Sequence, residues 1–341
     1  MTRAPDAVVV GAGVCGLACA QALSAAGLEL LVLERARGVG GRCATRRIAG
    51  QALDFGVAFL HGRNPDFLAA LRAVPATVVE GWPSEIHGTG RPCQPDAFAP
   101  GERRLVYAEG LGAFPEHMAR DLAVRLGAQV VRLEATDGAL ALHLEDGERI
   151  EAGKVVLALA PEETLALLGT IPEPPPEVGS AAALLEMIRS HACLAVLATY
   201  PEDAPRPTWQ VSYPETSAVV QIVSHDSSKR PRGSSLALVV QAHAAWSRHH
   251  LDDPDWPEAL LREVAALHGG WAARPAAVET HRWLFARGDR DAELAAPLWL
   301  RLPCRARLGV AGDRFAPGGG VEAAWLSGRR LAERILRETR A

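Results

Sequence analysis

The residues most able to do chemistry stand near the start of the chain, where a glycine-rich segment fits the pattern G-x-G-x-x-G. In this pattern the first glycine permits a tight turn, the second lets the backbone approach a pyrophosphate, and the third allows close contact between helix and strand. A helix that begins there offers free N–H groups and its positive dipole end to phosphates. The segment consists of Gly11, Ala12, Gly13, Val14, Cys15 and Gly16.

An acid follows the glycines at the spacing typical of dinucleotide-binding proteins. Glu34 ends the next apolar run, and its carboxylate can accept hydrogen bonds from both hydroxyls of a ribose. Its charge also repels a 2′-phosphate. The alternative is a glycine turn in an unrelated α/β protein, which the order of strand, glycines, helix, strand and acid disfavours.

The segment ERARGVGGR, which begins at Glu34, separates FAD from NAD. It contains Arg35, the adjacent pair Gly40 and Gly41, and Arg42. Two adjacent glycines and an arginine let the backbone and a guanidinium contact a second part of an extended dinucleotide. An ordinary basic surface loop is the alternative. We therefore predict FAD as the cofactor.

These residues need a parallel sheet to position them. Residues 7–10 are valine-rich, as expected of a strand buried on both faces. Residues 17–26 are rich in alanine and leucine and predict a helix that Gly27 ends. Residues 29–33 predict a second buried strand. The order is that of a βαβ unit with a right-handed crossover.

Further elements are expected in the middle and at the end of the chain. Strand patterns separated by Asp-Gly turns predict an antiparallel meander over residues 128–160 that returns to the parallel sheet. Residues 308–311 predict a strand and 321–338 the last helix. Other elements are expected in an inserted region, with strands at 192–199, 218–224 and 235–243 and a helix at 255–268.

The fold class is therefore α/β, with a discontinuous Rossmann-type FAD-binding domain and an inserted mixed α+β substrate domain. A length of 341 residues suits two interleaved domains. We expect the FAD-binding domain to comprise residues 1–60, 108–165 and 304–341. The substrate domain would comprise residues 61–107 and 166–303.

Composition narrows the class of partner. A net charge of −4 gives no electrostatic case for nucleic acid or anionic lipid. No apolar run is long enough to span a membrane, and glycines interrupt any signal-peptide core. The six cysteines form no CxxC pair, so neither zinc nor a CxxC redox pair is indicated. Cys15 and Cys19, four positions apart on the predicted helix, are expected to be small packing residues. Buried thiols suit a reducing compartment, and we expect the cytoplasm.

Beyond the glycine motif and ERARGVGGR, the segments LDFG at 53–56 and LHG at 60–62 resemble the flavin-containing amine oxidase superfamily. Its C-terminal flavin motif is similar to GDRFAPGGGVEAAWLSG at residues 312–328. The short length and the form of this ending most resemble the renalase-like branch. The resemblance is close over residues 6–62 and 305–340, moderate over 130–161, and poor in the insert.

The resemblance implies roles for further residues. Gly312 and Asp313 would hold the ribityl or pyrophosphate region, and Val131 would meet the adenine through its backbone. Gly41 and Arg42 would lie near the pyrophosphate and flavin. At the ring the resemblance implies Gly319, Gly320, Val321 and Glu322. A helix N-terminus there would stabilise the negative charge that reduced flavin carries near N1.

Two departures from the family pattern matter. Residues 312–328 contain no cysteine, so FAD is expected to be held non-covalently. The flavin-facing lysine of many amine oxidases is not identified, because Lys154 and Lys229 are the only lysines. The second departure weakens assignment to an ordinary amine oxidase.

Three side chains are candidates for the catalytic site. His61 would orient substrate or accept a proton, unless it is a structural histidine. Trp283 and Phe285 would form an aromatic wall over the flavin, with core packing as the alternative. No metal site is expected, because the adjacent His249 and His250 would point about 100° apart on a helix and no acids support them.

The expected function is that of an FAD-dependent oxidoreductase. A small reduced substrate would give a hydride to flavin N5, and O2 would take the electrons to form H2O2. The renalase-like resemblance implies dihydronicotinamide isomers of NAD(P)H as substrates. The alternatives are an amine oxidase or desaturase of the same superfamily, and a flavin-binding interaction protein without turnover.

Overall fold

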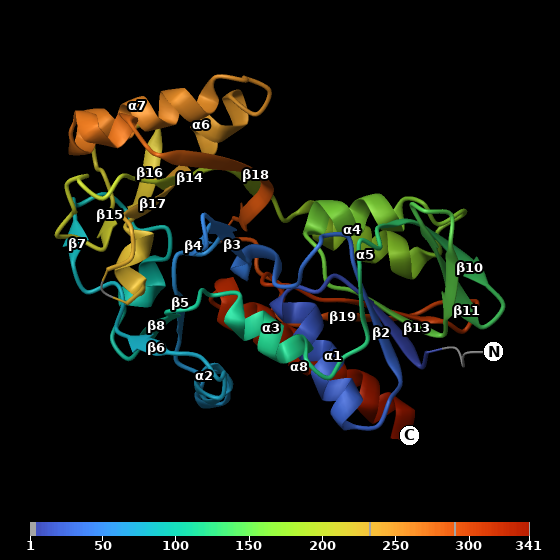
Figure 1. Ribbon diagram of the computed structural model, residues 1–341. Coiled ribbons are helices and arrows are strands. Elements are labelled where there is room, and N and C mark those ends of the chain that lie inside the picture. The colour runs from blue at the N-terminus through green and yellow to red at the C-terminus, as the bar shows by residue number, and fades with distance from the viewer. Residues whose placement is uncertain (1–4, 232, 290, 341) are drawn as a thin grey trace. The chain divides into compact units, whose positions relative to one another are not determined.

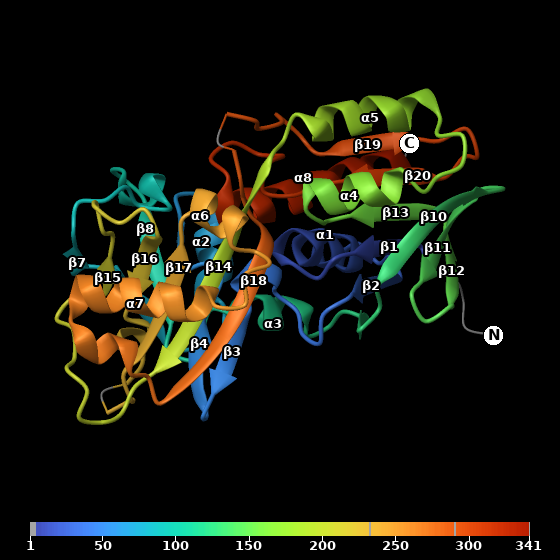
Figure 2. The same cartoon turned by 90° about the horizontal axis from the view of Figure 1, so that it is seen from above.

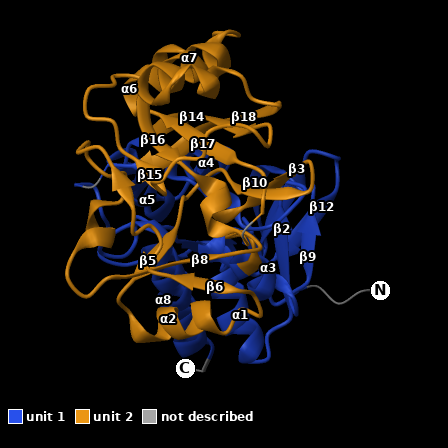
Figure 3. Ribbon diagram, turned by 60° about the vertical axis from the view of Figure 1, so that its left-hand side comes forward, with its two compact units in different colours: residues 1–41, 114–190, 288–341 blue, residues 42–113, 191–287 orange. Residues whose placement is uncertain are grey.

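The computed structural model describes residues 5–231, 233–289 and 291–340, and the chain divides into two compact units (Figure 3). Each unit is built from stretches that are far apart in the sequence. Unit 1 comprises Met1–Gly41, Phe114–Ser190 and Gly288–Ala341. Unit 2 comprises Arg42–Ala113 and His191–Arg287.

Unit 1 is organised around a six-stranded sheet in the order β19-β20-β13-β1-β2-β9. Figure 1 labels β2, β13 and β19 of this sheet. Its strands are β1 (Ala7–Val10), β2 (Leu30–Glu34), β9 (Val124–Leu126), β13 (Lys154–Leu157), β19 (Leu298–Arg301) and β20 (Arg307–Val310). All neighbours are parallel except β19, which pairs antiparallel with β20. Every residue of β1 is buried. The predicted βαβ unit is confirmed.

Two helices of unit 1 cross at very short range. They are α1 (Val14–Ala25) and α8 (Gly320–Arg340). A Cβ added at Gly328 would lie 2.1 Å from the Cys15 carbonyl oxygen and 3.0 Å from the Cys19 nitrogen. Cys15 and Cys19 are buried, which confirms them as small packing residues. The crossing therefore fixes the end of the chain against the helix that follows the glycine motif.

The predicted meander is present as a three-stranded antiparallel sheet of β10 (Val130–Thr136), β11 (Ala139–Leu144) and β12 (Arg149–Ala152). The chain then enters β13, where Val155 pairs in parallel with Val8. Helices α4 (Pro161–Leu168) and α5 (Pro176–Glu186) bury Leu167 and Leu185 in the same core as the meander leucines. A short helix, α3 (Ala113–Ala119), precedes β9.

Unit 2 contains a second six-stranded sheet, in the order β18-β14-β17-β16-β15-β7 (Figure 2). Its strands are β7 (Ile86–His87), β14 (Ser190–Thr199), β15 (Val211–Ser212), β16 (Val220–Ser224), β17 (Ala237–Ala242) and β18 (Ala277–Gly288). Helices α6 (Ala244–His249) and α7 (Trp256–His268) lie over one face, where α7 buries Leu260 and Val264 against Val196 and Val240.

The opposite face of this sheet is covered by the hairpin of β3 (Thr45–Ile48) and β4 (Gln51–Asp54). Ile48, Leu53 and Phe55 pack there against Leu197 and Val239. A small sheet of β5 (Leu60–Gly62), β6 (Val78–Glu80) and β8 (Arg103–Tyr107) and the helix α2 (Pro65–Arg72) complete the larger elements of the unit. Asn64 caps α2 by accepting from the backbone nitrogens of Asp66 and Phe67 at 3.0 Å. Short 3-10 helices are η1 (Gly41–Cys43), η2 (Pro95–Phe98), η3 (Asp226–Lys229) and η4 (Gly270–Ala273).

The compact units correct the expected domain boundaries in four segments. Residues 42–60 and 108–113 belong to unit 2, because the β3–β4 hairpin packs on the sheet of that unit. Residues 166–190 and 288–303 belong to unit 1, because α4, α5 and β19 share its core. Among the described residues, no helix is both long enough and apolar enough to cross a bilayer.

Candidate cofactor site

The glycine motif forms the turn between β1 and α1, and its three glycines are required for different reasons. Gly11 has φ +103°, and an added Cβ would lie 2.5 Å from the Ala158 carbonyl oxygen. A Cβ at Gly16 would lie 2.0 Å from the Gly11 oxygen. A Cβ added at Gly13 would have no protein atom within 4 Å beyond its chain neighbours. The first and third glycines therefore serve the fold, whereas the second borders an open cradle that fits a pyrophosphate.

The first turn of α1 suits an anion. Gly13 is the residue before the helix, and no side chain caps the amides that follow it. The first turn also contains no acid. Val14 and Cys15 stand in this turn, and phosphate oxygens are the acceptors that the backbone N–H groups of such helix ends bind.

Glu34 holds the glycine turn in place. Its Oε2 accepts from the Ala12 nitrogen at 2.8 Å, and its Oε1 accepts from the Ala36 nitrogen at 2.9 Å. Each oxygen keeps a further lone pair for a ribose hydroxyl. Glu34 thus has a structural role in the turn that the sequence pattern did not indicate, in addition to the predicted contact with ribose.

The second glycine pair lies against the first motif, as the two-segment cofactor site requires. The Gly40 nitrogen donates to the Ala12 oxygen at 2.8 Å, and Gly13 and Gly40 form a parallel bridge. A Cβ at Gly41 would lie 3.6 Å from the Gly13 Cα. Arg35 is exposed and pairs with Glu163 at 2.6 Å.

Replacing Glu34 by glutamine should weaken FAD binding by roughly 10- to 100-fold, because a charge-assisted hydrogen bond contributes about 1.5–3 kcal/mol. The amide would also place N–H groups opposite one of the two backbone donors, so the apoprotein should lose some thermal stability. Titration of apoprotein with FAD measures the first effect. Glu145→Gln, the same change at an exposed turn of unit 1, is the control. Unchanged FAD affinity in Glu34→Gln would show that the carboxylate does not hold the ribose.

The C-terminal motif leads from β20 to α8. Asp313 is buried and its Oδ2 lies 3.7 Å from Nη2 of Arg314. The Gly312 nitrogen donates to Oγ of Ser327 at 3.3 Å, which ties the start of the motif to α8. The helix begins at Gly320, so Val321 and Glu322 occupy its first turn. These are the residues expected at the N1 edge of the flavin.

The three glycines before α8 have φ values of +91° at Gly318, +60° at Gly319 and +73° at Gly320. Gly320→Val is therefore expected to damage flavin binding or lower its reduction potential, because valine rarely adopts positive φ. No protein atom lies within 4 Å of an added Cβ at Gly320, so backbone strain is the protein-side cause. Bound FAD and reduction potential are the measurements. A folded variant with wild-type values for both would remove the C-terminal half of the site.

Val131, expected to meet the adenine, lies at an irregularity of β10. The ladder with β11 shifts register between Val130 and Arg132, which leaves Val131 without a partner in the pairing. A bulged residue has backbone groups outside the ladder. Val131 is also 42% exposed. Both features support the proposed backbone contact.

The remaining candidates lie in unit 2. Nη1 of Arg42 donates to the Ala286 oxygen at 3.2 Å. Nδ1 of His61 lies 3.0 Å from Oε2 of Glu102. The ring of Trp283 stacks on Phe55 with centroids 5.1 Å apart, and its Nε1 donates to the Phe55 oxygen at 3.0 Å. Trp283 thus packs on the core, and Phe285, two residues along β18, is partly exposed.

Sequence reasoning missed a buried ionic cluster in unit 2, formed by Asp54, Asp226, Lys229 and Arg230. Nζ of Lys229 lies 3.0 Å from Oδ2 of Asp54 and 2.5 Å from Oδ1 of Asp226. Nη2 of Arg230 lies 3.1 Å and 2.9 Å from the same two carboxylates. Lys229 is fully buried and also lies over the ring of Trp82 at 4.8 Å. The spacing of Asp226, Lys229 and Arg230 at i, i+3 and i+4 was the one local feature of the sequence that could have indicated this cluster.

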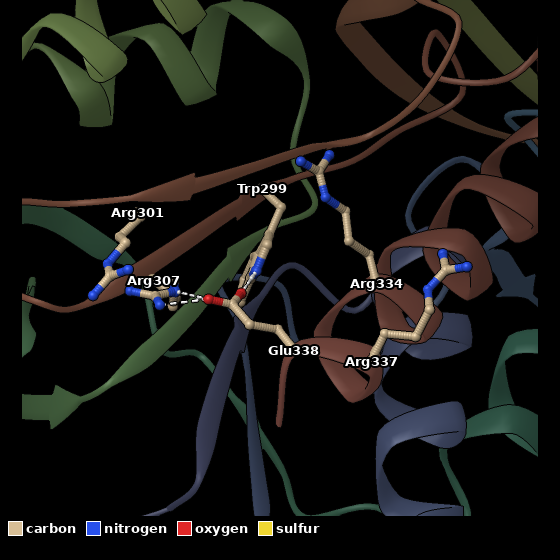
Figure 4. A pocket seen from close by; sticks show the side chains of 6 residues that line it. All are labelled: Trp299, Arg301, Arg307, Arg334, Arg337 and Glu338. Atoms are coloured by element: carbon tan, nitrogen blue, oxygen red, sulfur yellow. Dashed lines mark hydrogen bonds and ion pairs between the residues drawn. The ribbon is translucent and has the colours of Figure 1, made fainter. Parts of the chain in front are cut away.

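A pocket of about 380 Å³ lies at the opposite end of α8 (Figure 4). Trp299 and Arg307 point toward Glu338, which accepts from both. The residues that line it are Trp299, Arg301, Arg307, Arg334, Arg337 and Glu338. Because Arg334 is 14 residues (334 minus 320) beyond Gly320, it lies about 21 Å along the helix from the flavin motif. Arginines at a helix C-terminus also complement its dipole. The pocket is separate from the cofactor site.

Two family models match the chain. The model for flavin containing amine oxidoreductase matches residues 78–336, and the model for an NAD(P)-binding Rossmann-like domain matches residues 9–74. The chain therefore belongs to the flavin-containing amine oxidoreductase family. It is an FAD-dependent oxidoreductase, and the family confirms the α/β fold and the cofactor inferred from the glycine motifs.

Each curated relative matches a short part of the chain. A nicotine dehydrogenase of Pseudomonas putida is 39% identical over 75 residues, which are 22% of this chain and 16% of the relative. A polyamine oxidase of Oryza sativa subsp. japonica is 45% identical over 68 residues, or 20% of this chain and 14% of the relative. The match thus spans less than a fifth of the length of these relatives.

Solved structures match nearly the whole chain. The cyclohexylamine oxidase of Brevibacterium oxydans superposes with a TM-score of 0.75 at 15% identity, over 99% of this chain and 100% of that one. At this identity the similarity concerns the fold alone. The chain thus shares the fold of this oxidase.

Proposed function

We propose that this protein oxidises a small amine, with hydride transfer to FAD and reoxidation by O2 to give H2O2. FAD supplies the redox chemistry when bound, since its N5 accepts a hydride. The observation that carries the proposal is the crossing of α1 and α8 at Gly328, because it joins the pyrophosphate cradle and the C-terminal flavin motif in one unit. The family and the names of the relatives support amines as the substrate class.

The chain's own residues would divide the remaining tasks. The first turn of α8 would stabilise negative charge at the flavin N1 edge. The Glu102 carboxylate would accept from Nδ1–H of His61 and so orient the ring. Nε2 of His61 would then be free to accept a proton from the substrate. Trp283, fixed by its bond to the Phe55 oxygen, would hold Phe285 in place as the aromatic wall.

A second candidate is oxidation of dihydronicotinamide isomers of NAD(P)H. The motif GDRFAPGGGVEAAW at residues 312–325 favours it, since this motif resembles the renalase-like branch. Desaturation by the same hydride chemistry is a third possibility within the superfamily.

Anaerobic stopped-flow spectroscopy tests the proposal. Purified holoprotein is mixed with amines, dihydronicotinamide isomers and saturated carbonyl compounds, and bleaching of the oxidised-flavin absorbance is followed. Bleaching by amines is the expected result. Bleaching only by the nicotinamides transfers the assignment to the second candidate, and no bleaching by any class overturns the oxidase proposal in favour of a flavin-binding interaction protein.

We further propose that FAD is held non-covalently, since residues 312–328 contain no cysteine. Acid precipitation of the yellow protein should release the flavin into the supernatant at about one equivalent per chain. Flavin that stays in the washed pellet would contradict this proposal.

A further inference from the structure

Arg287, at the end of β18 in unit 2, is a guanidinium surrounded by neutral groups. Its Nη2 donates to Oε1 of Gln241 at 3.0 Å, and its Nη1 donates to Oε1 of Gln221. Nη2 also lies 4.0 Å from Sγ of Cys193. These side chains project from neighbouring strands of one sheet. Among residues 5–231, 233–289 and 291–340, no carboxylate pairs with Arg287.

This arrangement leaves a largely buried positive charge without compensation. The two amide oxygens satisfy hydrogen bonds and fix the guanidinium, but they carry no net charge. Burial raises the pKa of both adjacent thiols, Cys93 and Cys193, the latter to about 11, so both are neutral near pH 7. Burying a charge without an opposite charge is strongly unfavourable. The hydrogen bonds to the two glutamines position Arg287, but no ion pair among the described residues balances its charge.

Two further buried donors of unit 2 lack acceptors among the described residues. The hydroxyl of Tyr213 is buried and has no hydrogen-bond partner in the described part of the chain, and its residue is 1% exposed. Nε of Arg104 is also buried and without a partner there. Burial raises the pKa of Tyr213, and the Arg287 and Arg104 guanidiniums oppose that rise, so both act on its hydroxyl. The hydroxyl is therefore a protonated donor.

A cluster of two cations and a free hydroxyl donor needs an acceptor with negative charge. A carboxylate matches it, because a planar guanidinium binds two carboxylate oxygens side by side and a phenol can donate to a remaining lone pair. Arg287 is partly exposed, whereas the Tyr213 hydroxyl and Nε of Arg104 are buried.

We propose that Arg104, Tyr213 and Arg287 form a carboxylate-binding site, and that the substrate is an amine or reduced compound that carries a carboxylate. This inference rests on the proposed function, because it assigns substrate binding to unit 2. It makes Arg287 a specificity-determining residue.

The test uses benzoate and its neutral isostere benzamide with FAD-loaded protein at constant ionic strength. Dissociation constants come from titration calorimetry and from the rise in melting temperature. Benzoate is expected to bind at least tenfold more tightly than benzamide. Arg287→Gln should weaken benzoate binding roughly 10- to 100-fold, the factor expected when a charge-assisted hydrogen bond is lost. Arg274→Gln removes an exposed arginine of the same unit and should change nothing.

Tyr213→Phe is a second variant that removes no hydrogen bond within the described protein, so its fold should persist. It should weaken benzoate binding several-fold and leave benzamide unaffected. Equal binding of benzoate and benzamide, or wild-type benzoate affinity in Arg287→Gln, would overturn the inference. Binding of inorganic phosphate in preference to benzoate would also overturn it.

The outcomes separate this inference from the proposed function. If benzoate binding depends on Arg287 but no compound bleaches the flavin, the carboxylate site stands and the oxidase proposal fails. If 4-aminobutanoate and butylamine bleach the flavin with equal apparent affinity, the oxidase proposal stands and the carboxylate site is excluded from substrate recognition.

Discussion

Gly16→Ala should abolish stable FAD binding, with a loss of affinity of about 100-fold or more. The added Cβ would lie 2.0 Å from the Gly11 oxygen, so either the turn or the start of α1 must move. Overpacking of this kind costs about 1–3 kcal/mol, and each charge-assisted hydrogen bond lost to the pyrophosphate adds about 1.5–3 kcal/mol. The measurements are the flavin content of the purified protein, the FAD affinity of the apoprotein, and the apoprotein melting temperature.

Gly13→Ala is the matched control, because it makes the same chemical change three positions before Gly16. No protein atom lies within 4 Å of its Cβ, and its φ is −73°. The free energy of unfolding of the apoprotein should therefore change by no more than about 1 kcal/mol. FAD affinity should fall, because the methyl group enters the pyrophosphate cradle. If Gly16→Ala retains FAD and Gly13→Ala leaves the affinity unchanged, the pyrophosphate does not lie on this turn.

The contrast between these two glycines shows why the sequence predicts unit 1 well. Its cofactor turn, its buried strand β1 and its Asp-Gly hairpins depend on short-range patterns, and each appears within a few residues of its expected place. The proline-rich stretch of residues 171–176 runs directly into a helix. Pro176 is the first residue of α5, where a fixed φ near −65° suits a helix start.

Unit 2 was predicted less completely, because its defining interactions join residues far apart in the chain. Lys229 and Asp54 are 175 positions apart, and neither residue type in isolation indicates the partner. The long strand β18 alternates between partly buried and exposed residues and is rich in charged and aromatic side chains, so no apolar run marks it. The role of Arg287 likewise depends on Gln221 and Gln241, which only the sheet brings together.

The buried ionic cluster gives the second large expected effect. Asp54→Asn should destabilise unit 2 by about 3–5 kcal/mol, because removal of one partner leaves a buried charge uncompensated. The amide keeps the size of the side chain and an acceptor for the Leu111 nitrogen, which donates to Oδ1 of Asp54 at 2.8 Å. The loss of stability therefore measures the effect of removing the negative charge of Asp54. After the change, Asp226 alone would face two cations, Lys229 and Arg230.

Urea denaturation followed by tryptophan fluorescence measures this effect, since all tryptophans except Trp299 and Trp325 lie in unit 2. Flavin fluorescence reports separately on release of FAD. Glu80→Gln, which breaks the half-exposed pair of Arg72 and Glu80, is the control and should cost roughly 0–1 kcal/mol. A loss in Asp54→Asn no larger than in this control would mean that the cluster is not ionised as its geometry implies.

A double variant and a pH series identify charge balance as the cause. Asp54→Asn combined with Lys229→Met removes one charge of each sign, so it should be more stable than the sum of the single changes predicts. Burial opposes ionisation of Asp54, but the Lys229 ammonium and the Arg230 guanidinium hold the pKa of its carboxyl below the usual value. The contribution of Asp54 is therefore fully present above the unfolded pKa of about 3.9 and is lost as the pH falls through the lower folded pKa. The stability difference between wild type and Asp54→Asn should accordingly be constant near neutral pH and shrink in strong acid. A difference that persists unchanged there would assign the effect to lost packing and hydrogen bonding, and not to charge.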